Sequence, residues 1–233
     1  MIADNIRPDH RVTAIGKTRS GKSFWVRDLI RRVGGRYVQR YPYYRVLVFN
    51  TKPTKSYDGI PAVRFRNGAR FGKADQAARE RGLWVLHYRP GRDEADPEAY
   101  DELIGRAMER GYLTIVLDEI AHINEGRANN TGANFRYAMK AGGELGVGVW
   151  GLTQTPSFVP HETLSEQEHV AVFRLKEGYD QDKARGLVGK GDAVLPDGRV
   201  VRAPEIPFGE EWKHAAWYRN DDMEQARLYK SLV

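Results

Sequence analysis

The sequence predicts an α/β domain whose mostly parallel sheet is flanked by helices. Strand-like and helix-like segments alternate along the chain, and residues 113–117 (LTIVL) form the continuous apolar run typical of strands buried on both faces. With 41% hydrophobic and 29% charged residues, the composition is close to that of an average globular protein. A collagen, a coiled coil and a disordered chain are therefore excluded.

The first third of the chain predicts two strands and one helix. Residues 11–15 (RVTAI) and 44–49 (YRVLVF) have the length and composition of strands. Between them, a glycine-bounded loop spans residues 16–22. Apolar residues at helical spacing then predict a helix over 23–33, and the Gly34–Gly35 pair predicts its end.

The middle of the chain continues the alternation. Residues 83–88 (LWVLHY) predict a strand, and residues 89–96 a polar loop. Asp96 as a cap and Pro97 as the first helical residue predict a helix over 97–110. The apolar strand 113–117 follows.

The last part of the chain predicts further strands and helices with no linker between them. The predicted elements are a helix at 134–145, strands at 147–152 and 169–175, a β-hairpin at 193–201 and a short helix at 223–232. We therefore expect one domain, 1–233, with a core at about 10–175 and a C-terminal appendage at about 176–233.

Residues 16–23 (GKTRSGKS) match the phosphate-binding pattern G-x-x-x-x-G-K-[ST] at every fixed position. The two glycines let backbone N–H groups curl around a phosphate, Lys22 adds a positive charge, and the Ser23 hydroxyl can ligate Mg²⁺. The match also follows a predicted strand and opens a predicted helix, as the pattern requires. The predicted nucleotide-binding residues are Gly16, Lys17, Thr18, Arg19, Ser20, Gly21, Lys22, Ser23 and Phe24.

A second candidate site lies where the strand 113–117 ends in two carboxylates, Asp118 and Glu119. Parallel sheets bind ligands at this edge, so Asp118 is predicted to hold Mg²⁺ through water and Glu119 to polarise the attacking water. Alone, the string also fits a strand that ends in a polar turn. Together with residues 16–23 it predicts ATP hydrolysis.

Gln154 follows the strand 147–152, in the string Thr153-Gln154-Thr155-Pro156. Its amide could hydrogen-bond a γ-phosphate or the attacking water. The residue also fits a polar position in a proline-terminated turn.

Charge is distributed unevenly along the chain. Residues 1–72 carry 16 Lys and Arg against 4 Asp and Glu, whereas residues 73–233 carry 21 against 27. The N-terminal third therefore forms either a surface that faces a polyanion or a solvated basic face.

Cysteine is absent, which excludes disulfides, zinc-thiolate sites and cysteine nucleophiles. No apolar run approaches the length of a membrane span, and the first residues are polar. We expect neither a membrane span nor a secretory signal.

Together, GKTRSGKS, LTIVLDE and GVGVWGLTQTP resemble the FtsK–HerA superfamily of P-loop DNA-pumping ATPases. Given the chain's size, the resemblance is closest to the genome-packaging ATPases of icosahedral double-stranded DNA viruses with an internal membrane. It implies a RecA-like core with sheet order 5-1-4-3-2, a hexameric ring around DNA, ATP and Mg²⁺ as cofactors, and a capsid vertex as partner. The implied location is the host cytoplasm or the virion. The resemblance also implies catalytic roles for Lys22, Glu119 and Gln154.

In one position the chain departs from that family. The family carries Gly-Arg on the helix before the Thr-Gln strand, with the arginine reaching a neighbouring subunit's site, but Gly143 occupies that arginine's place here. Candidate substitutes are Arg136, Lys140, Arg127 and Arg89. Each of them also fits an ordinary surface cation.

Duplex DNA is expected to be held through its phosphates by basic residues of the N-terminal third. The candidates are Arg64, Arg66 and Arg70, with Lys52 and Lys55. Phe65 and Phe71 alternate with these arginines and are either DNA contacts or core anchors of a strand. The small, polar segment 126–133 is a candidate mobile loop.

Other classes of P-loop protein remain open on the sequence. A small-molecule kinase or a phage morphogenesis ATPase would not act on DNA, and a degenerate nucleotide switch would not hydrolyse ATP. Lys22, Asp118 and Glu119 argue against the switch.

Overall fold

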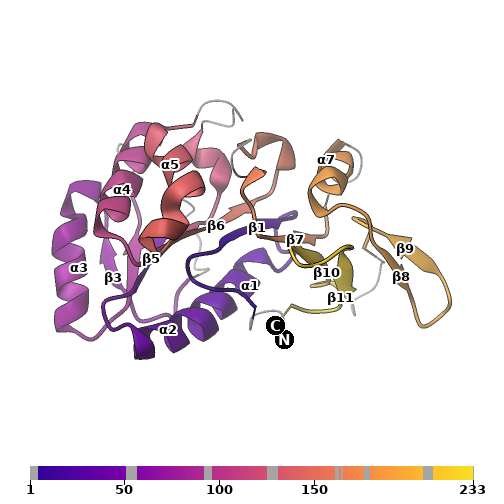
Figure 1. Ribbon diagram of the computed structural model, residues 1–233, viewed down its shortest axis with the longest axis horizontal. Helices are drawn as coiled ribbons and strands as arrows, with labels where there is room; N and C mark the ends of the chain where they lie inside the picture. Colours follow the sequence, from indigo (N-terminus) through magenta and orange to yellow (C-terminus); the bar gives the residue numbers. More distant parts are fainter. Residues whose placement is uncertain are drawn as a thin grey trace.

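The protein's structure, a computed structural model, describes residues 5–50, 57–91, 96–124, 131–160, 163, 165–175, 179–206 and 212–232. Its centre is a nine-stranded sheet of order β11-β10-β7-β1-β6-β5-β2-β4-β3 (Figure 1). The strands are β1 (Arg11–Ile15), β2 (Arg45–Phe49), β3 (Val63–Phe65), β4 (Val85–Tyr88), β5 (Leu113–Leu117), β6 (Val147–Thr153), β7 (His169–Phe173), β10 (Ala216–Asn220) and β11 (Arg227–Tyr229).

The seven strands from β7 to β3 are parallel to their neighbours, whereas β10 and β11 run antiparallel. If β1, β2, β5, β6 and β7 are counted from one to five, their order in the sheet is 5-1-4-3-2. The predicted order is therefore confirmed, and β4 with β3 extends the sheet at one edge.

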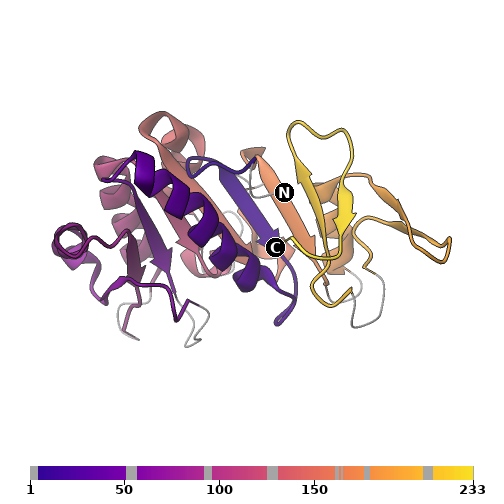
Figure 2. The same ribbon diagram turned by 90° about the horizontal axis from the view of Figure 1, so that it is seen from below.

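Helices cover both faces of the sheet (Figures 1 and 2). On one face, α1 (Lys22–Leu29) continues through the π-helical η2 (Ile30–Gly34) into α2 (Gly35–Arg40). On the other face lie α3 (Phe71–Glu80), α4 (Pro97–Arg110) and α5 (Ala133–Ala141). The short 3₁₀ segments are η3 (Gly68–Arg70), η5 (Ile120–Ile123), η6 (Gly142–Leu145) and η7 (Pro156–Phe158).

The two faces build two hydrophobic clusters, as alternation along β2 shows. Val46 and Val48 pack with Trp25 of α1, whereas Leu47 and Phe49 pack on the other side with Leu103 of α4. Strand β5 is buried along its whole length, which confirms the prediction for a strand covered on both faces.

Local sequence signals predicted the bounds of several elements accurately. Helix α4 spans the predicted residues 97–110, and the Asp96 side chain accepts a hydrogen bond from the Ala99 N–H at 2.8 Å. The C-terminal hairpin is also present, as β8 (Asp192–Val194) and β9 (Val200–Arg202). Helix α5 is shorter than the predicted 134–145, because its last turn is the 3₁₀ segment η6.

Two predictions were wrong. The 223–232 segment is not a helix, because residues 227–229 pair as β11 with β10. Gly34 and Gly35 do not end the first helix, since both have helical φ values of about −60° and the chain continues to Arg40.

The prediction also missed β3, α3, β10 and α7 (Tyr179–Val188). Among the described residues no helix is long and apolar enough to cross a membrane.

Gly34 is needed for close packing rather than for a turn. A Cβ atom there would lie 2.3 Å from Cζ3 of Trp84, whereas a Cβ on Gly35 would meet nothing within 4 Å. We expect Gly34→Ala to lower the free energy of unfolding by about 1–3 kcal/mol through overpacking. Gly35→Ala is expected to raise it by about 0.5–1 kcal/mol through helix propensity. Urea denaturation of both variants measures the difference, and equal effects of the two would contradict this account.

Candidate functional site

The loop of residues 16–21 joins β1 to α1 at the carboxyl edge of the sheet. The Gly16 N–H donates to the carbonyl of Thr153 at 3.1 Å, and the Lys17 N–H donates to that of Arg174 at 2.8 Å. A Cβ on Gly16 would lie 2.7 Å from Cβ of Phe173, so a side chain there would push the loop off β7. The loop is thereby fixed to both neighbours of β1.

Lys22 begins α1 and is buried, with 6% exposure. Its ammonium donates to the carbonyl of Gly16 and, at 2.9 Å, to that of Lys17. The preceding Gly21 has a φ of 109°, which favours glycine, and contributes no side chain to cap the helix. The Lys22 ammonium therefore lies against the loop beside the N-terminus of α1, and the positive charge of both suits an anion.

Ser20 is 2% exposed, and its hydroxyl oxygen has no hydrogen-bond partner among the described residues. A buried polar atom in a glycine-bounded loop is the kind of group that a bound phosphate satisfies. The loop therefore fits the phosphates of a nucleotide.

Asp118 follows β5 and is 2% exposed. The Ser23 hydroxyl donates to its Oδ1 at 3.4 Å, and the Tyr57 hydroxyl donates to the same atom at 3.0 Å. Burial, followed by the charge and the hydrogen bond of Asp118, raises the pKa of Tyr57 well above its ordinary value. Tyr57 therefore stays a donor to this carboxylate. A hydroxyl beside a carboxylate is an oxygen donor set that fits Mg²⁺.

Hydrogen bonds connect Glu119, Gln154 and Thr18, which follow β5, β6 and β1 respectively. The Gln154 side-chain amide donates to Oε2 of Glu119 at 3.3 Å, and its backbone N–H donates to Oε1 at 3.3 Å. The Thr18 hydroxyl in turn donates to Oε1 of Gln154 at 2.5 Å. The glutamine therefore joins the second carboxylate to the phosphate-binding loop.

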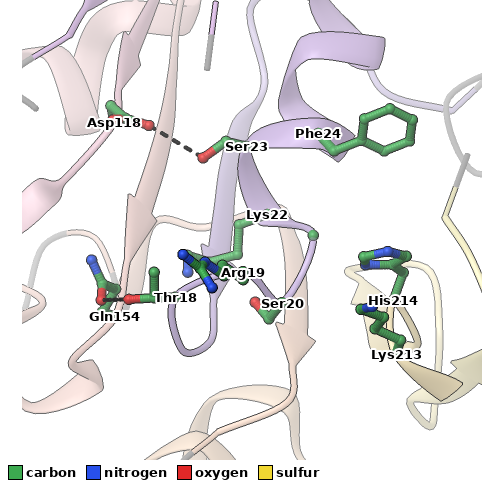
Figure 3. A pocket seen from close by; sticks show the side chains of 11 residues that line it. Thr18, Arg19, Ser20, Lys22, Ser23, Phe24, Asp118, Gln154, Lys213 and His214 are labelled. Carbon is green, nitrogen blue, oxygen red and sulfur yellow. Dashed lines mark hydrogen bonds between the residues drawn. The ribbon is translucent and has the colours of Figure 1, made fainter. Parts of the chain in front are cut away.

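A pocket of about 620 Å³ opens over these groups (Figure 3). It is lined by Thr18, Arg19, Ser20, Gly21, Lys22, Ser23, Phe24, Asp118, Gln154, Lys213 and His214. The structure thus brings together most residues predicted for the nucleotide and the metal. Sequence reasoning missed Tyr57, Lys213 and His214, which no local motif marks.

Of the candidates for a trans-acting cation, Arg89, Arg136 and Lys140 do not line this pocket. Arg136 and Lys140 are exposed on α5, and Arg136 donates through Nη1 to the Thr131 carbonyl at 2.6 Å. Arg89 is exposed directly after β4, which is four strands from β1 in the sheet. Arg127 lies outside the described residues. The identity of a trans-acting arginine stays a prediction.

The predicted DNA-binding arginines meet at the outer edge of the sheet. Arg64, Arg66 and Arg70 are exposed and line a groove of about 1010 Å³ together with Lys73. Arg64 pairs with Asp58 at 3.3 Å, but both side chains are exposed, so the pair is weak. Lys52, Lys55 and residues 126–130 of the predicted mobile loop lie outside the described residues.

Phe65 and Phe71 are buried in the cluster under α3 and α4. Of the two interpretations open for these rings, the structure supports core anchors rather than DNA contacts.

The fold is shared with solved P-loop NTPases, although no protein-family model and no curated protein sequence matches the chain. The genome packaging NTPase B204 of Sulfolobus turreted icosahedral virus 2, in complex with ATP-gammaS, is 12% identical with a TM-score of 0.67. The match covers 98% of this chain and 100% of that one. A crystal structure of B204 from Sulfolobus turreted icosahedral virus, described as a DNA-packaging ATPase, is 14% identical with a TM-score of 0.62. It covers 98% of this chain and all of that one.

ATPases 2 and 3 of EssC from Geobacillus thermodenitrificans are 13% identical with a TM-score of 0.57, covering 94% of this chain and 39% of that one. These likenesses show the fold, which is the α/β fold that the motif resemblance implies.

Tyr57→Phe tests the bond to Asp118. The variant keeps the ring and removes the charge-assisted hydrogen bond, so the free energy of unfolding should fall by about 1.5–3 kcal/mol. Urea denaturation measures the change. Unaltered stability would mean that the Tyr57 hydroxyl does not hold the carboxylate.

Proposed function

We propose that the chain is an ATPase that binds ATP with Mg²⁺ in the pocket over residues 16–23. One observation carries the proposal: residues 16–23 contact both carboxylates at the end of β5, through Ser23 to Asp118 and through Thr18 and Gln154 to Glu119. Phosphate binding, metal binding and water activation are the three tasks of such an enzyme, and the residues proposed for each task lie close together.

The loop N–H groups and Lys22 bind the phosphates, and Ser23 with Asp118 would hold Mg²⁺. When bound, the metal supplies positive charge that offsets the charge developing on the phosphates. Tyr57 keeps Asp118 in place through its hydrogen bond.

Glu119 orients the attacking water and accepts its proton. Gln154 donates two hydrogen bonds to this carboxylate and accepts one from Thr18. Loss of the γ-phosphate would therefore shift Gln154, which follows β6. An arginine from a neighbouring subunit, with Arg136 or Arg89 as candidates, would complete the site in a ring.

Glu119→Gln separates binding from chemistry. Because the amide cannot accept the proton, the ATP hydrolysis rate should fall by about 10²–10⁴-fold. ATP should still bind. Lys22→Ala, the matched control, should lose ATP binding itself. Steady-state hydrolysis and equilibrium binding distinguish the two, and full turnover by Glu119→Gln would remove this role from the carboxylate.

We infer further that hydrolysis drives duplex DNA into a viral capsid. Support comes from the fold shared with the B204 DNA-packaging ATPase and from the groove at Arg64, Arg66 and Arg70. None of the described lining residues of that groove is acidic, which suits a phosphate backbone. In this role the chain works as a hexameric ring at a capsid vertex, in the host cytoplasm or the virion.

Replacement of Arg64, Arg66 and Arg70 by Ala should weaken duplex binding equally on all sequences. The slope of log affinity against log salt should flatten by about 0.9 for each phosphate that the variant no longer neutralises. The matched control replaces the exposed Arg185, Arg199 and Arg202 at the opposite end of the molecule (Figure 1). Fluorescence anisotropy with labelled duplexes at several salt concentrations gives the slope. An equal change in the control would place the DNA surface elsewhere.

A second candidate is an ATPase that moves a cargo other than DNA. The fold is also that of EssC and of the type VII secretion ATPase EccC from Thermomonospora curvata, which is 17% identical with a TM-score of 0.54 and covers 96% of this chain and 25% of that one. Stimulation of hydrolysis by linear duplex DNA favours the first candidate, and hydrolysis indifferent to DNA favours the second.

A further inference from the structure

The C-terminal part of the chain supplies one wall of the pocket, and the direction of β10 explains why. Because β10 runs antiparallel to β7, with Ala216 opposite Phe173, β10 begins at the edge where β7 ends. Lys213 and His214 shortly precede β10 and therefore lie at the phosphate-binding edge. His214 lies close to the loop itself, since a Cβ on Gly21 would be 3.2 Å from its Nδ1.

Phe24 lines the same pocket from α1. Trp25 and Val26 are buried against the sheet, whereas Phe24 is 51% exposed. The guanidinium of Arg27 lies 5.1 Å from the centre of the Phe24 ring, a contact that holds the ring in place. Of the large apolar side chains exposed within the described ranges, Phe24 is the one that lines this pocket.

The two ends of the pocket differ in chemistry. Figure 3 shows Asp118, Gln154 and Thr18 on one side of the loop and the Phe24 and His214 rings on the other. Polar groups suited to a metal and phosphates thus occupy one end, and two flat rings suited to stacking occupy the other. The volume of about 620 Å³ lies within the range of small-molecule sites, about 300–1,000 Å³.

We propose that the space bounded by Phe24 and His214 binds the base of the nucleotide, with the base stacked on these rings. This inference rests on the proposed function, since the phosphates of the same molecule lie in the loop. Stacking suits any nucleobase because every base has a π-face. The C-terminal appendage therefore distinguishes a nucleotide from a bare polyphosphate.

The test compares two probes in the presence of Mg²⁺: a non-hydrolysable ATP analogue and inorganic tripolyphosphate, which has no base. Phe24→Ala and His214→Ala should each raise the Kd of the analogue by about 5- to 100-fold. The Kd of tripolyphosphate should stay within about twofold, because the loop is untouched. Phe24→Tyr keeps the π-face and should bind the analogue as the parent chain does, whereas Phe24→Leu should not. Titration calorimetry measures each Kd.

Tyr137→Ala, which removes an equally exposed aromatic ring from α5, is the matched control. Unchanged analogue affinity in both alanine variants would overturn the base site and leave the proposed function standing. Equal weakening of both probes would overturn it as well, since the rings would then act on the loop. Failure of the parent chain to bind either probe would overturn the proposed function together with this inference.

Discussion

The position of β6 between β1 and β5 is the constraint on which the site depends. In this register Ile15 lies opposite Thr153 and Leu117 lies opposite Gly151, so all three strands end at one edge. The residues that follow them, the loop from Gly16, Asp118 with Glu119, and Gln154, are therefore neighbours although they lie far apart in sequence. Gly151 also matters, because a Cβ there would lie 2.1 Å from Cδ1 of Ile120, whose side chain packs on β6 directly after Glu119.

A second contribution comes from the antiparallel β10. Parallel strands bring only their carboxyl ends to the site, but an antiparallel neighbour brings the residues that precede it. Phe173 of β7 lies next to Gly16 of the phosphate-binding loop and also pairs with Ala216 of β10. The appendage thus joins the core through the strand that supports the loop, and its Lys213 and His214 reach the pocket.

Local signals in the sequence were sufficient where the cause of a structure is local. Asp96 and Pro97 define the start of α4, and glycines with Lys22 define the loop. Local signals were insufficient where a residue distant in the sequence determines the structure. Gly34 continues a helix because Trp84 lies against it, and residues 227–229 are a strand because β10 pairs with them. For the same reason Tyr57 and His214 could not be predicted, since each reaches the site through a contact across the fold.

We propose that residues 16–23 and the carboxylates of Asp118 and Glu119 form one nucleotide site. A crystal structure of the chain with a non-hydrolysable ATP analogue and Mg²⁺ tests this most directly. We expect phosphate density within the loop and metal density between Ser23 and Asp118. Nucleotide bound elsewhere on the chain, or phosphates in the loop with the metal remote from Asp118, would contradict it.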